Sequence, residues 1–288
     1  MSAKETTNPI RNISDTALWV AVYRAMESER PDALFHDPYA RRLAGERGEA
    51  IVNTMPLGKQ MSWAMVIRTA VMDEMIMRCI EQGAKTVLNL AAGLDTRAYR
   101  LDLPADLRWY HVDFQPIVDF MQDRLSDEKA RCKLEYVAAD LREEEQRDAL
   151  FKKASDHGPV LVITEGLLIY LLPEQVASLA KSLRRTALAK WWITDLASPL
   201  LLKRLAKSWS KKLEQGNAPF QFAPKEGTAF FKPFGWNEAE YRSNWDESMR
   251  LKRPMRFAWF WNLVMKLQTK AQQEAGRRMS GIVLFESN

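Results

Sequence analysis

A short apolar strand leads directly into a turn of small residues in the segment 86–100, TVLNLAAGLDTRAYR. Ala91, Ala92 and Gly93 form this turn, and side chains this small let the backbone approach a ligand closely. Such a strand and turn are typical of a nucleotide cofactor site at the carboxyl edge of a parallel sheet. Asp95 follows the glycine, where a dinucleotide-binding turn would offer bare backbone amides to a pyrophosphate. The turn therefore favours a cationic or neutral ligand over a phosphate.

Strands and helices alternate along most of the chain. The sequence predicts strands near 85–90, 108–114, 133–139, 159–164 and 190–196, with a last strand over about 281–286. It predicts helices near 61–82, 96–102, 115–130, 143–155 and 173–188, preceded by a helix to about residue 29 that Ser14 or Asp15 caps. Alternation of this kind implies right-handed crossovers and a parallel sheet, so the expected fold class is α/β.

The composition is that of one enzyme domain with a sizeable core. Of the 288 residues, 47% are hydrophobic, which is ample for a single large α/β domain. Cys79 and Cys132 do not form a CxxC pair, so we expect reduced thiols and no metal site. The first twelve residues lack an apolar leader, and the apolar stretches 160–172 and 257–265 are short or interrupted by polar residues. We therefore expect a cytoplasmic protein without a membrane partner.

The formal net charge of +5 is a weaker indication of partners. Basic residues concentrate in the ranges 203–212 and 250–256. They form either a solvated helix face or a rim that attracts an anionic substrate. Nucleic-acid binding is not expected, because these clusters lack the interleaved aromatic residues of a base-stacking platform.

Several further motifs occur in order along the chain. They are TALWVAVYRAMESERPDALFHDPYARRLAG at 16–45, IRT at 67–69, AAGLDTRAYRL at 91–101, HVDFQPIVDF at 111–120, AADLRE at 138–143 and ITEGLLIYL at 163–171. Together they resemble the class I S-adenosylmethionine (SAM) methyltransferases, in the branch related to leucine carboxyl methyltransferases and polyketide-type O-methyltransferases. Ala91 departs from the family pattern, since many relatives carry a glycine there. Beyond residue 200 the resemblance is limited to an FGW–EYRS stretch at 234–243.

The resemblance implies a Rossmann-like, doubly wound sheet of seven strands, mostly parallel, with an antiparallel last strand. We expect one methyltransferase domain over 1–288, divided into an N-terminal helical cap (1–82), a cofactor-binding core (83–197), a substrate lid (198–279) and the last strand (280–288). The segment 198–279 is rich in tryptophan and phenylalanine. These aromatic side chains either anchor ordinary helices on the sheet or line a lid that selects a planar or apolar acceptor.

Charged residues follow the predicted strands. Asp113 ends the second strand and can accept hydrogen bonds from both ribose hydroxyls, a device that NAD enzymes share. The resemblance implies that Asp140 and Leu141 face adenine, that Glu165 meets the methionine ammonium or lines the methyl-transfer site, and that Arg68 binds the methionine carboxylate. Taken singly, the acidic residues could be helix N-caps and Arg68 a surface charge. Their joint occurrence favours a cofactor site.

Two charged residues have several predicted roles. Asp95 either caps the following helix or, as the resemblance implies, lies close to the sulfonium. Arg97 and Arg100 are candidates to pair with it or with Asp102. Arg24 lies on a largely apolar helix face, where it pairs with Asp37 or Glu27 or points into the cofactor cleft.

The implied activity is SAM-dependent transfer of a methyl group to an oxygen of a small-molecule acceptor, a carboxylate or a phenolic hydroxyl, in secondary metabolism. None of His36, His111 and His157 is placed as a general base, so the catalytic residue is left open. This favours a carboxylate or an intrinsically acidic hydroxyl as the acceptor. The alternatives are a protein C-terminal carboxyl methyltransferase and an NAD(P)-dependent oxidoreductase. Asp95 and the absence of a GxGxxG motif argue against the oxidoreductase. The sequence leaves the oligomeric state open.

Overall fold

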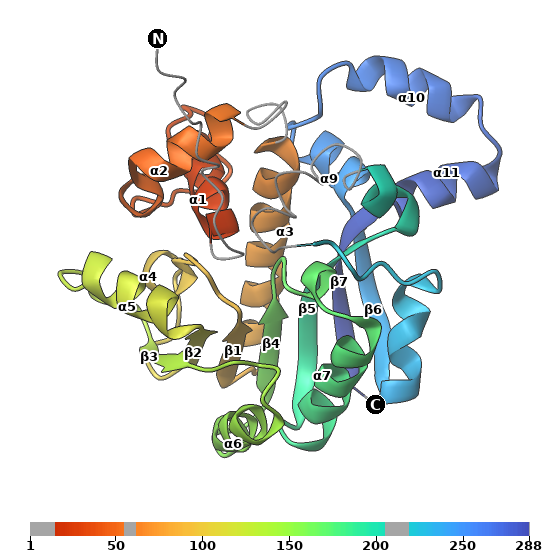
Figure 1. Cartoon of the computed structure of the whole chain (residues 1–288). Helices are drawn as coiled ribbons and strands as arrows, with labels where there is room; N and C mark the ends of the chain where they lie inside the picture. Colours follow the sequence, from red (N-terminus) through yellow and green to blue (C-terminus); the bar gives the residue numbers. More distant parts are fainter. Residues whose placement is uncertain (1–14, 55–61, 205–218, 288) are drawn as a thin grey trace, which may run out of the picture.

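The computed structural model describes residues 15–54, 62–204 and 219–287 (Figure 1). Its strands are β1 (Thr86–Leu90), β2 (Arg108–Asp113), β3 (Lys133–Ala138), β4 (Val160–Thr164), β5 (Ala189–Ala197), β6 (Trp236–Ser243) and β7 (Ser280–Ser287). They form one seven-stranded sheet in the order β3-β2-β1-β4-β5-β7-β6. The first five strands are parallel, whereas β7 runs antiparallel to both β5 and β6. The predicted fold class, including the antiparallel last strand, is confirmed.

The helices follow the same alternation. They are α1 (Asp15–Ser28), α2 (Ala40–Thr54), α3 (Ser62–Glu81), α4 (Arg97–Arg100), α5 (Gln115–Arg124), α6 (Glu144–Ser155), α7 (Pro173–Arg185), α9 (Asn244–Arg250), α10 (Ala258–Lys266) and α11 (Lys270–Arg277), with the 3-10 helices η2 (Leu168–Tyr170) and η3 (Gly227–Phe234). The helix predicted over 115–130 ends at Arg124, because Leu125 leaves the helical conformation. Of the two predicted caps of the first helix, Ser14 lies outside the described residues.

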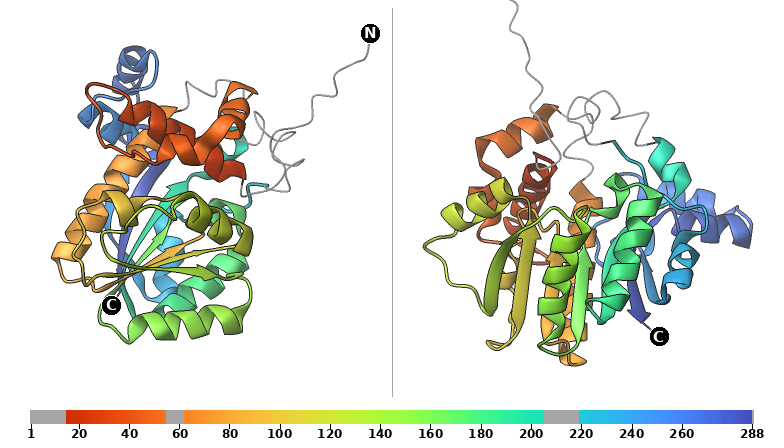
Figure 2. Two further views of the ribbon diagram at one scale, coloured as in Figure 1. Left: turned by 90° about the vertical axis from the view of Figure 1, so that its left-hand side faces the viewer. Right: turned by 60° about the horizontal axis from the view of Figure 1, so that its bottom comes forward.

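Helices cover both faces of the sheet (Figure 2). One face packs against α3, α4 and α5 through a core that includes Val87, Trp109 and Ile193. The opposite face packs against α6, α7 and η3 through a core that includes Leu88 and Trp192. Neighbouring strand residues thus enter opposite cores, as the two-residue repeat of a strand requires. Both faces are buried, which explains why β1 and β4 are buried along their whole length and mainly apolar.

The aromatic-rich segment after residue 198 divides between two environments. Phe222, Phe231 and Trp236 are buried and pack with Trp192 on the sheet, so they anchor this region as one of the two predictions stated. Helix α10, by contrast, is largely exposed. Trp209 lies outside the described residues, and the role of this segment as a substrate lid stays a prediction. Among the described helices, none has both the length and the apolar character needed to cross a bilayer.

Candidate active site

A cavity of about 1050 Å³ opens at the carboxyl ends of the parallel strands. This edge is where open α/β sheets bind ligands. All nine residues predicted as a cofactor site line the cavity: Arg68, Ala91, Ala92, Gly93, Asp95, Asp113, Asp140, Leu141 and Glu165. Side chains of α1 and α3, among them Trp19 and Trp63, form part of its wall. The fold therefore brings together residues that lie up to 97 positions apart in the sequence, from Arg68 to Glu165.

The turn after β1 and the end of β2 hold each other in place. The backbone amide of Gly93 donates a hydrogen bond of 2.7 Å to Asp113, and the amide of Phe114 donates another of 2.7 Å to the second carboxylate oxygen. Gly93 has a φ of +55°, and an added Cβ would lie 3.1 Å from the side chain of Ala17, so the turn needs a glycine here. Burial raises the pKa of Asp113, while the two amide bonds oppose that rise. Its carboxylate is thus fixed at the cavity wall.

The end of β3 carries a second carboxylate in a more open setting. Arg142 donates to Asp140 through its guanidinium at 2.6 Å and through its backbone amide at 3.0 Å. Hydrogen bonding from Arg142 lowers the pKa of Asp140. Leu141 lies between them in the sequence and also lines the cavity. This corner therefore offers one acidic group beside one apolar side chain.

Arg97 is the centre of a buried ion-pair network. Its guanidinium contacts Asp73 at 2.6 Å, Asp95 at 2.7 Å and Glu165 at 2.7 Å, while its side chain is only 2% exposed. The backbone amide of Arg97 also donates to Asp95 at 2.8 Å, as an acidic residue before a helix does. Of the predicted partners of Asp95, the helix start and Arg97 are therefore present, whereas Arg100 pairs with Asp73 at 2.7 Å. Asn89 on β1 donates a further 2.8 Å bond to Asp95.

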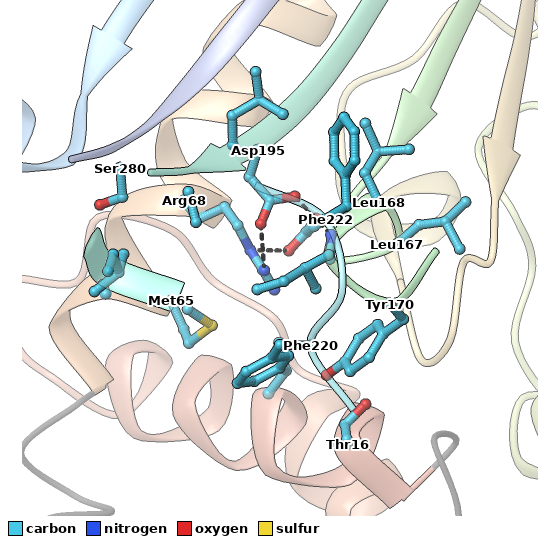
Figure 3. Close-up of a pocket in the computed structure, with 18 of the residues that line it drawn as sticks. Thr16, Met65, Arg68, Leu167, Leu168, Tyr170, Asp195, Phe220, Phe222 and Ser280 are labelled. Atoms are coloured by element: carbon cyan, nitrogen blue, oxygen red, sulfur yellow. Dashed lines mark hydrogen bonds and ion pairs between the residues drawn. The ribbon is translucent and has the colours of Figure 1, made fainter. Parts of the chain in front are cut away.

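Arg68 extends this network across the cavity wall (Figure 3). Its Nε lies 2.9 Å from Glu165 and its Nη1 lies 3.1 Å from Asp195 at the end of β5. Asp195 also accepts a 2.7 Å bond from the amide of Gly166. Nε and Nη1 of Arg68 thus each have a carboxylate partner. Among the described residues, none forms a hydrogen bond or an ion pair with Nη2.

The network has one more negative charge than positive charges. Burial on its own would raise the pKa values of Asp95 and Glu165, but the adjacent charge of Arg97 lowers both, that of Asp95 well below its usual range. Both carboxylates are therefore ionised at neutral pH. Its members are three guanidinium groups, Arg68, Arg97 and Arg100, and four carboxylates, Asp73, Asp95, Glu165 and Asp195. One formal negative charge remains, which suits the cationic ligand that the sequence of the turn favours.

Arg24 connects α1 to the turn after β1. Its guanidinium pairs with Asp37 at 2.8 Å and donates a 2.6 Å bond to the carbonyl of Leu94. Glu27, the other predicted partner, pairs instead with Arg253. Arg24 also lines the cavity, so pairing and orientation toward the cleft occur together.

Another part of the cavity lining is mainly apolar (Figure 3). Met65, Leu168, Phe220 and Phe222 line it together with Tyr170, whose ring centroid lies 5.6 Å from that of Phe220. Burial raises the pKa of Tyr170 to about 12, so its phenol stays protonated at neutral pH. This part of the lining can hold an apolar molecule but offers few groups that exchange protons.

None of the three histidines is among the described residues that line the cavity. His111 is buried on β2, its Nε2 lies 3.1 Å from the carbonyl of Gly93, and burial lowers its pKa to about 4. It is a core histidine with a hydrogen-bond partner. His36 and His157 are exposed. In the part of the chain that the structure describes, no cluster of three or more candidate ligands is arranged to hold a metal ion.

Two charged residues of the network were missed by the sequence analysis. Asp195 follows the apolar strand WWIT in the same way that Asp113 follows WYHV, so the rule that identified Asp113 would also have found it. Asp73 interrupts a methionine-rich helix face, and an acidic residue there indicates a buried partner. That partner, Arg97, lies on another helix, and no spacing rule connects the two.

Comparison with known proteins agrees with this arrangement. A profile of the leucine carboxyl methyltransferase family matches residues 17–184. A protein from Saccharopolyspora erythraea, provisionally named an S-adenosyl-L-methionine-dependent methyltransferase, is 37% identical over 192 residues, which are 62% of this chain and 65% of that protein. The chain thus spans less than two thirds of the length of this relative.

Solved structures share the fold at low sequence identity. A protein from Thermobifida fusca, provisionally described as a methyltransferase, has a TM-score of 0.59 at 16% identity, with 100% of both chains covered. Magnesium protoporphyrin IX methyltransferase from Synechocystis, solved with bound SAH, has a TM-score of 0.51 at 14% identity and covers 87% of this chain and 93% of its own. These similarities show the fold alone.

Proposed function

The chain belongs to the leucine carboxyl methyltransferase family, and we propose that it transfers a methyl group from SAM to an oxygen atom of a small-molecule acceptor. The observation that carries this proposal is the Asp113 carboxylate, fixed by the amides of Gly93 and Phe114 beside a buried network with one net negative charge. This wall offers acceptors for hydroxyl groups and a field that favours a cation. The family match argues against the oxidoreductase alternative.

The residues present fit SAM, which bears a sulfonium, an ammonium and a carboxylate. When bound, SAM supplies an activated methyl group. Asp113 would accept from the ribose hydroxyls, and Asp140 and Leu141 would hold the adenine. Glu165 and Asp95 would face the two cationic centres, while the Nη2 of Arg68 would meet the carboxylate. The apolar wall excludes water and aligns the acceptor, which is the main contribution a protein makes to such a displacement.

The cavity favours an acceptor that is already ionised. A phenol with a pKa near 10 needs a general base, whereas a carboxylate does not. Among the described lining residues there is no histidine, and Tyr170 has its pKa raised to about 12 by burial. Asp195 is held by Arg68 and the Gly166 amide. We therefore favour a carboxylic acid as the acceptor.

A protein C-terminal carboxylate is the second candidate. Arg204 and Arg277, both from the segment after residue 198, line the cavity and would suit an anionic peptide end. The aromatic lining by Phe220, Phe222 and Trp261 favours a small apolar acid instead.

Calorimetric titration tests the cofactor. SAM and S-adenosylhomocysteine should bind with micromolar affinity and NADH should not bind. Asp113→Asn should weaken the binding of SAM and of S-adenosylhomocysteine by at least ten-fold, because a charge-assisted hydrogen bond contributes about 1.5–3 kcal/mol. Asp119→Asn is the matched control, since this exposed carboxylate on α5 lies outside the cavity. Binding of NADH alone would refute the proposal.

Transfer of a labelled methyl group tests the acceptor class. A methyl ester releases volatile methanol in alkali, whereas an aryl methyl ether does not. We expect alkali-labile label from a panel of apolar carboxylic acids. Label that appears only in peptides would support the second candidate, and alkali-stable label would contradict a carboxylate acceptor.

A further inference from the structure

Helix α10 and its flanks expose large apolar side chains. Six of the eleven exposed large apolar residues in the described chain lie within eleven consecutive positions: Phe257, Trp259, Phe260, Trp261, Leu263 and Leu267. Trp259 is 71% exposed and Leu267 is 83% exposed. Because so many exposed large apolar side chains in one short segment are unusual on a protein surface that faces only water, they indicate an interaction site.

The charged residues within the segment 251–273 all have one sign. Between positions 251 and 273 the sequence carries five basic residues and no aspartate or glutamate: Lys252, Arg253, Arg256, Lys266 and Lys270. Arg253 pairs with Glu27 at 2.9 Å, and within the described residues no carboxylate pairs with the other four. The patch is therefore apolar with an uncompensated positive rim.

The patch adjoins the cavity. Figures 1 and 2 show α10 at the periphery of the molecule, at the end where the carboxyl ends of the parallel strands lie. Met255, Trp261, Met265 and Gln268 come from this same segment and line the cavity. The surface and the interior of the site are thus continuous along α10.

We propose that α10 docks on the surface of an anionic lipid bilayer and that the acceptor enters the cavity from that surface. Tryptophan and phenylalanine with flanking lysine and arginine are the side chains that bind a bilayer interface, and the rim complements anionic headgroups. The acceptor is then a lipophilic acid with its carboxylate toward the cavity. The statement about the acceptor rests on the proposed function. The docking on a bilayer revises the expectation that no membrane takes part.

Charge disfavours a second copy of the chain as the occupant. Two copies packed through α10 would bring two positive rims together, and like charges across an interface weaken association. Leu263 and Leu267 are aliphatic and cannot stack on nucleic-acid bases, whereas they insert readily among acyl chains.

Vesicle flotation tests the docking. The full chain should float with vesicles of phosphatidylcholine and phosphatidylglycerol, and at least ten-fold less with phosphatidylcholine alone. Lys266→Gln combined with Lys270→Gln should weaken binding about thirty-fold, since each basic residue near an anionic surface contributes a factor of about five. Lys129→Gln combined with Lys152→Gln, which changes two exposed lysines elsewhere, should leave it within two-fold.

A second pair of variants tests the apolar contact. Trp259→Ser should weaken flotation at least ten-fold, whereas Leu188→Asn, which removes an exposed leucine far from α10 in the sequence, should not. Absence of flotation, equal flotation with neutral vesicles, or a dimer in sedimentation that Trp259→Ser dissociates would each overturn the docking. Calorimetry with SAM on the same preparations separates the two proposals, because Trp259 does not line the cavity. If SAM fails to bind while flotation persists, only the proposed function fails.

Discussion

Replacement of Arg97 by methionine should destabilise the protein strongly. Of its three carboxylate partners, Asp73 keeps Arg100 at 2.7 Å and Glu165 keeps Arg68 at 2.9 Å. Asp95 would lose its only recorded ion pair among the described residues and keep the 2.8 Å bond from Asn89 and the amide at position 97. The substitution therefore leaves one buried carboxylate without a compensating charge. This should lower the free energy of unfolding by about 3–5 kcal/mol at neutral pH.

The stability deficit of Arg97→Met, meaning its lower free energy of unfolding relative to the unaltered protein, should depend on pH. In the native protein the pKa values of Asp95 and Glu165 lie below their ordinary values despite burial, because of Arg97. A depressed folded pKa stabilises the protein above the unfolded pKa, near 4, and that stabilisation is lost as the pH falls through the folded value. Without Arg97, burial raises the pKa of Asp95, so this carboxylate is protonated more readily. Protonation removes the buried charge and with it the cost of burying it. The deficit of Arg97→Met should therefore shrink between pH 7 and about pH 4.

Urea denaturation of both proteins at several pH values measures this difference. Arg142→Met is the matched control, because that side chain is 61% exposed and its pair with Asp140 should contribute less than about 1 kcal/mol. A deficit for Arg97→Met no larger than that of the control, or one that does not change with pH, would refute the reasoning.

Three further changes test other parts of the structure. Ala91 has a φ of +50°, so Ala91→Val should lower the free energy of unfolding by about 2 kcal/mol, whereas Ala91→Gly should stay within about 1 kcal/mol; thermal denaturation distinguishes them. An added Cβ at Gly281 would lie 2.5 Å from the ring of Tyr241, so Gly281→Ala should lower the free energy of unfolding by about 2 kcal/mol. Gly276→Ala should not, because nothing lies within 4 Å of the added Cβ there. Equal urea midpoints for the two variants would contradict this. The His111 pKa of about 4 lies below its unfolded value, so the unfolded chain binds more protons and stability should fall between about pH 6.5 and pH 4; an imidazole that titrates near 6.5 by NMR would refute the burial argument.

The central strands β1 and β4 were predictable because each is a mainly apolar run between turns. β1 and β4 are buried along their full length, and their bounds lie within one residue of the predicted ones. Short helices were less well predicted, since α4 has only four residues and its ends depend on the turn before it. The segment from 198 onward showed little periodicity, and its division into η3, β6, α9, α10 and α11 follows from tertiary packing.

The site was predictable where a strand end alone places a residue, as for Asp113 and Asp140. It was not predictable where two helices meet. The contact between Arg97 and Asp73 depends on how α3 crosses the sheet, and no local pattern in the sequence describes that crossing. The same holds for Arg68, whose two partners lie on β5 and after β4.

The position of β7 has a consequence for how the sheet is completed during synthesis. β6 is made before β7, yet β7 lies between β5 and β6 and pairs with both. Until β7 emerges from the ribosome, β6 lacks its neighbour in this sheet, and β5 presents an unpaired edge to other chains. Such an edge is a template for aggregation. The nascent protein is therefore most vulnerable between the synthesis of β6 and the emergence of β7, and the pairing of β7 with both strands ends that period.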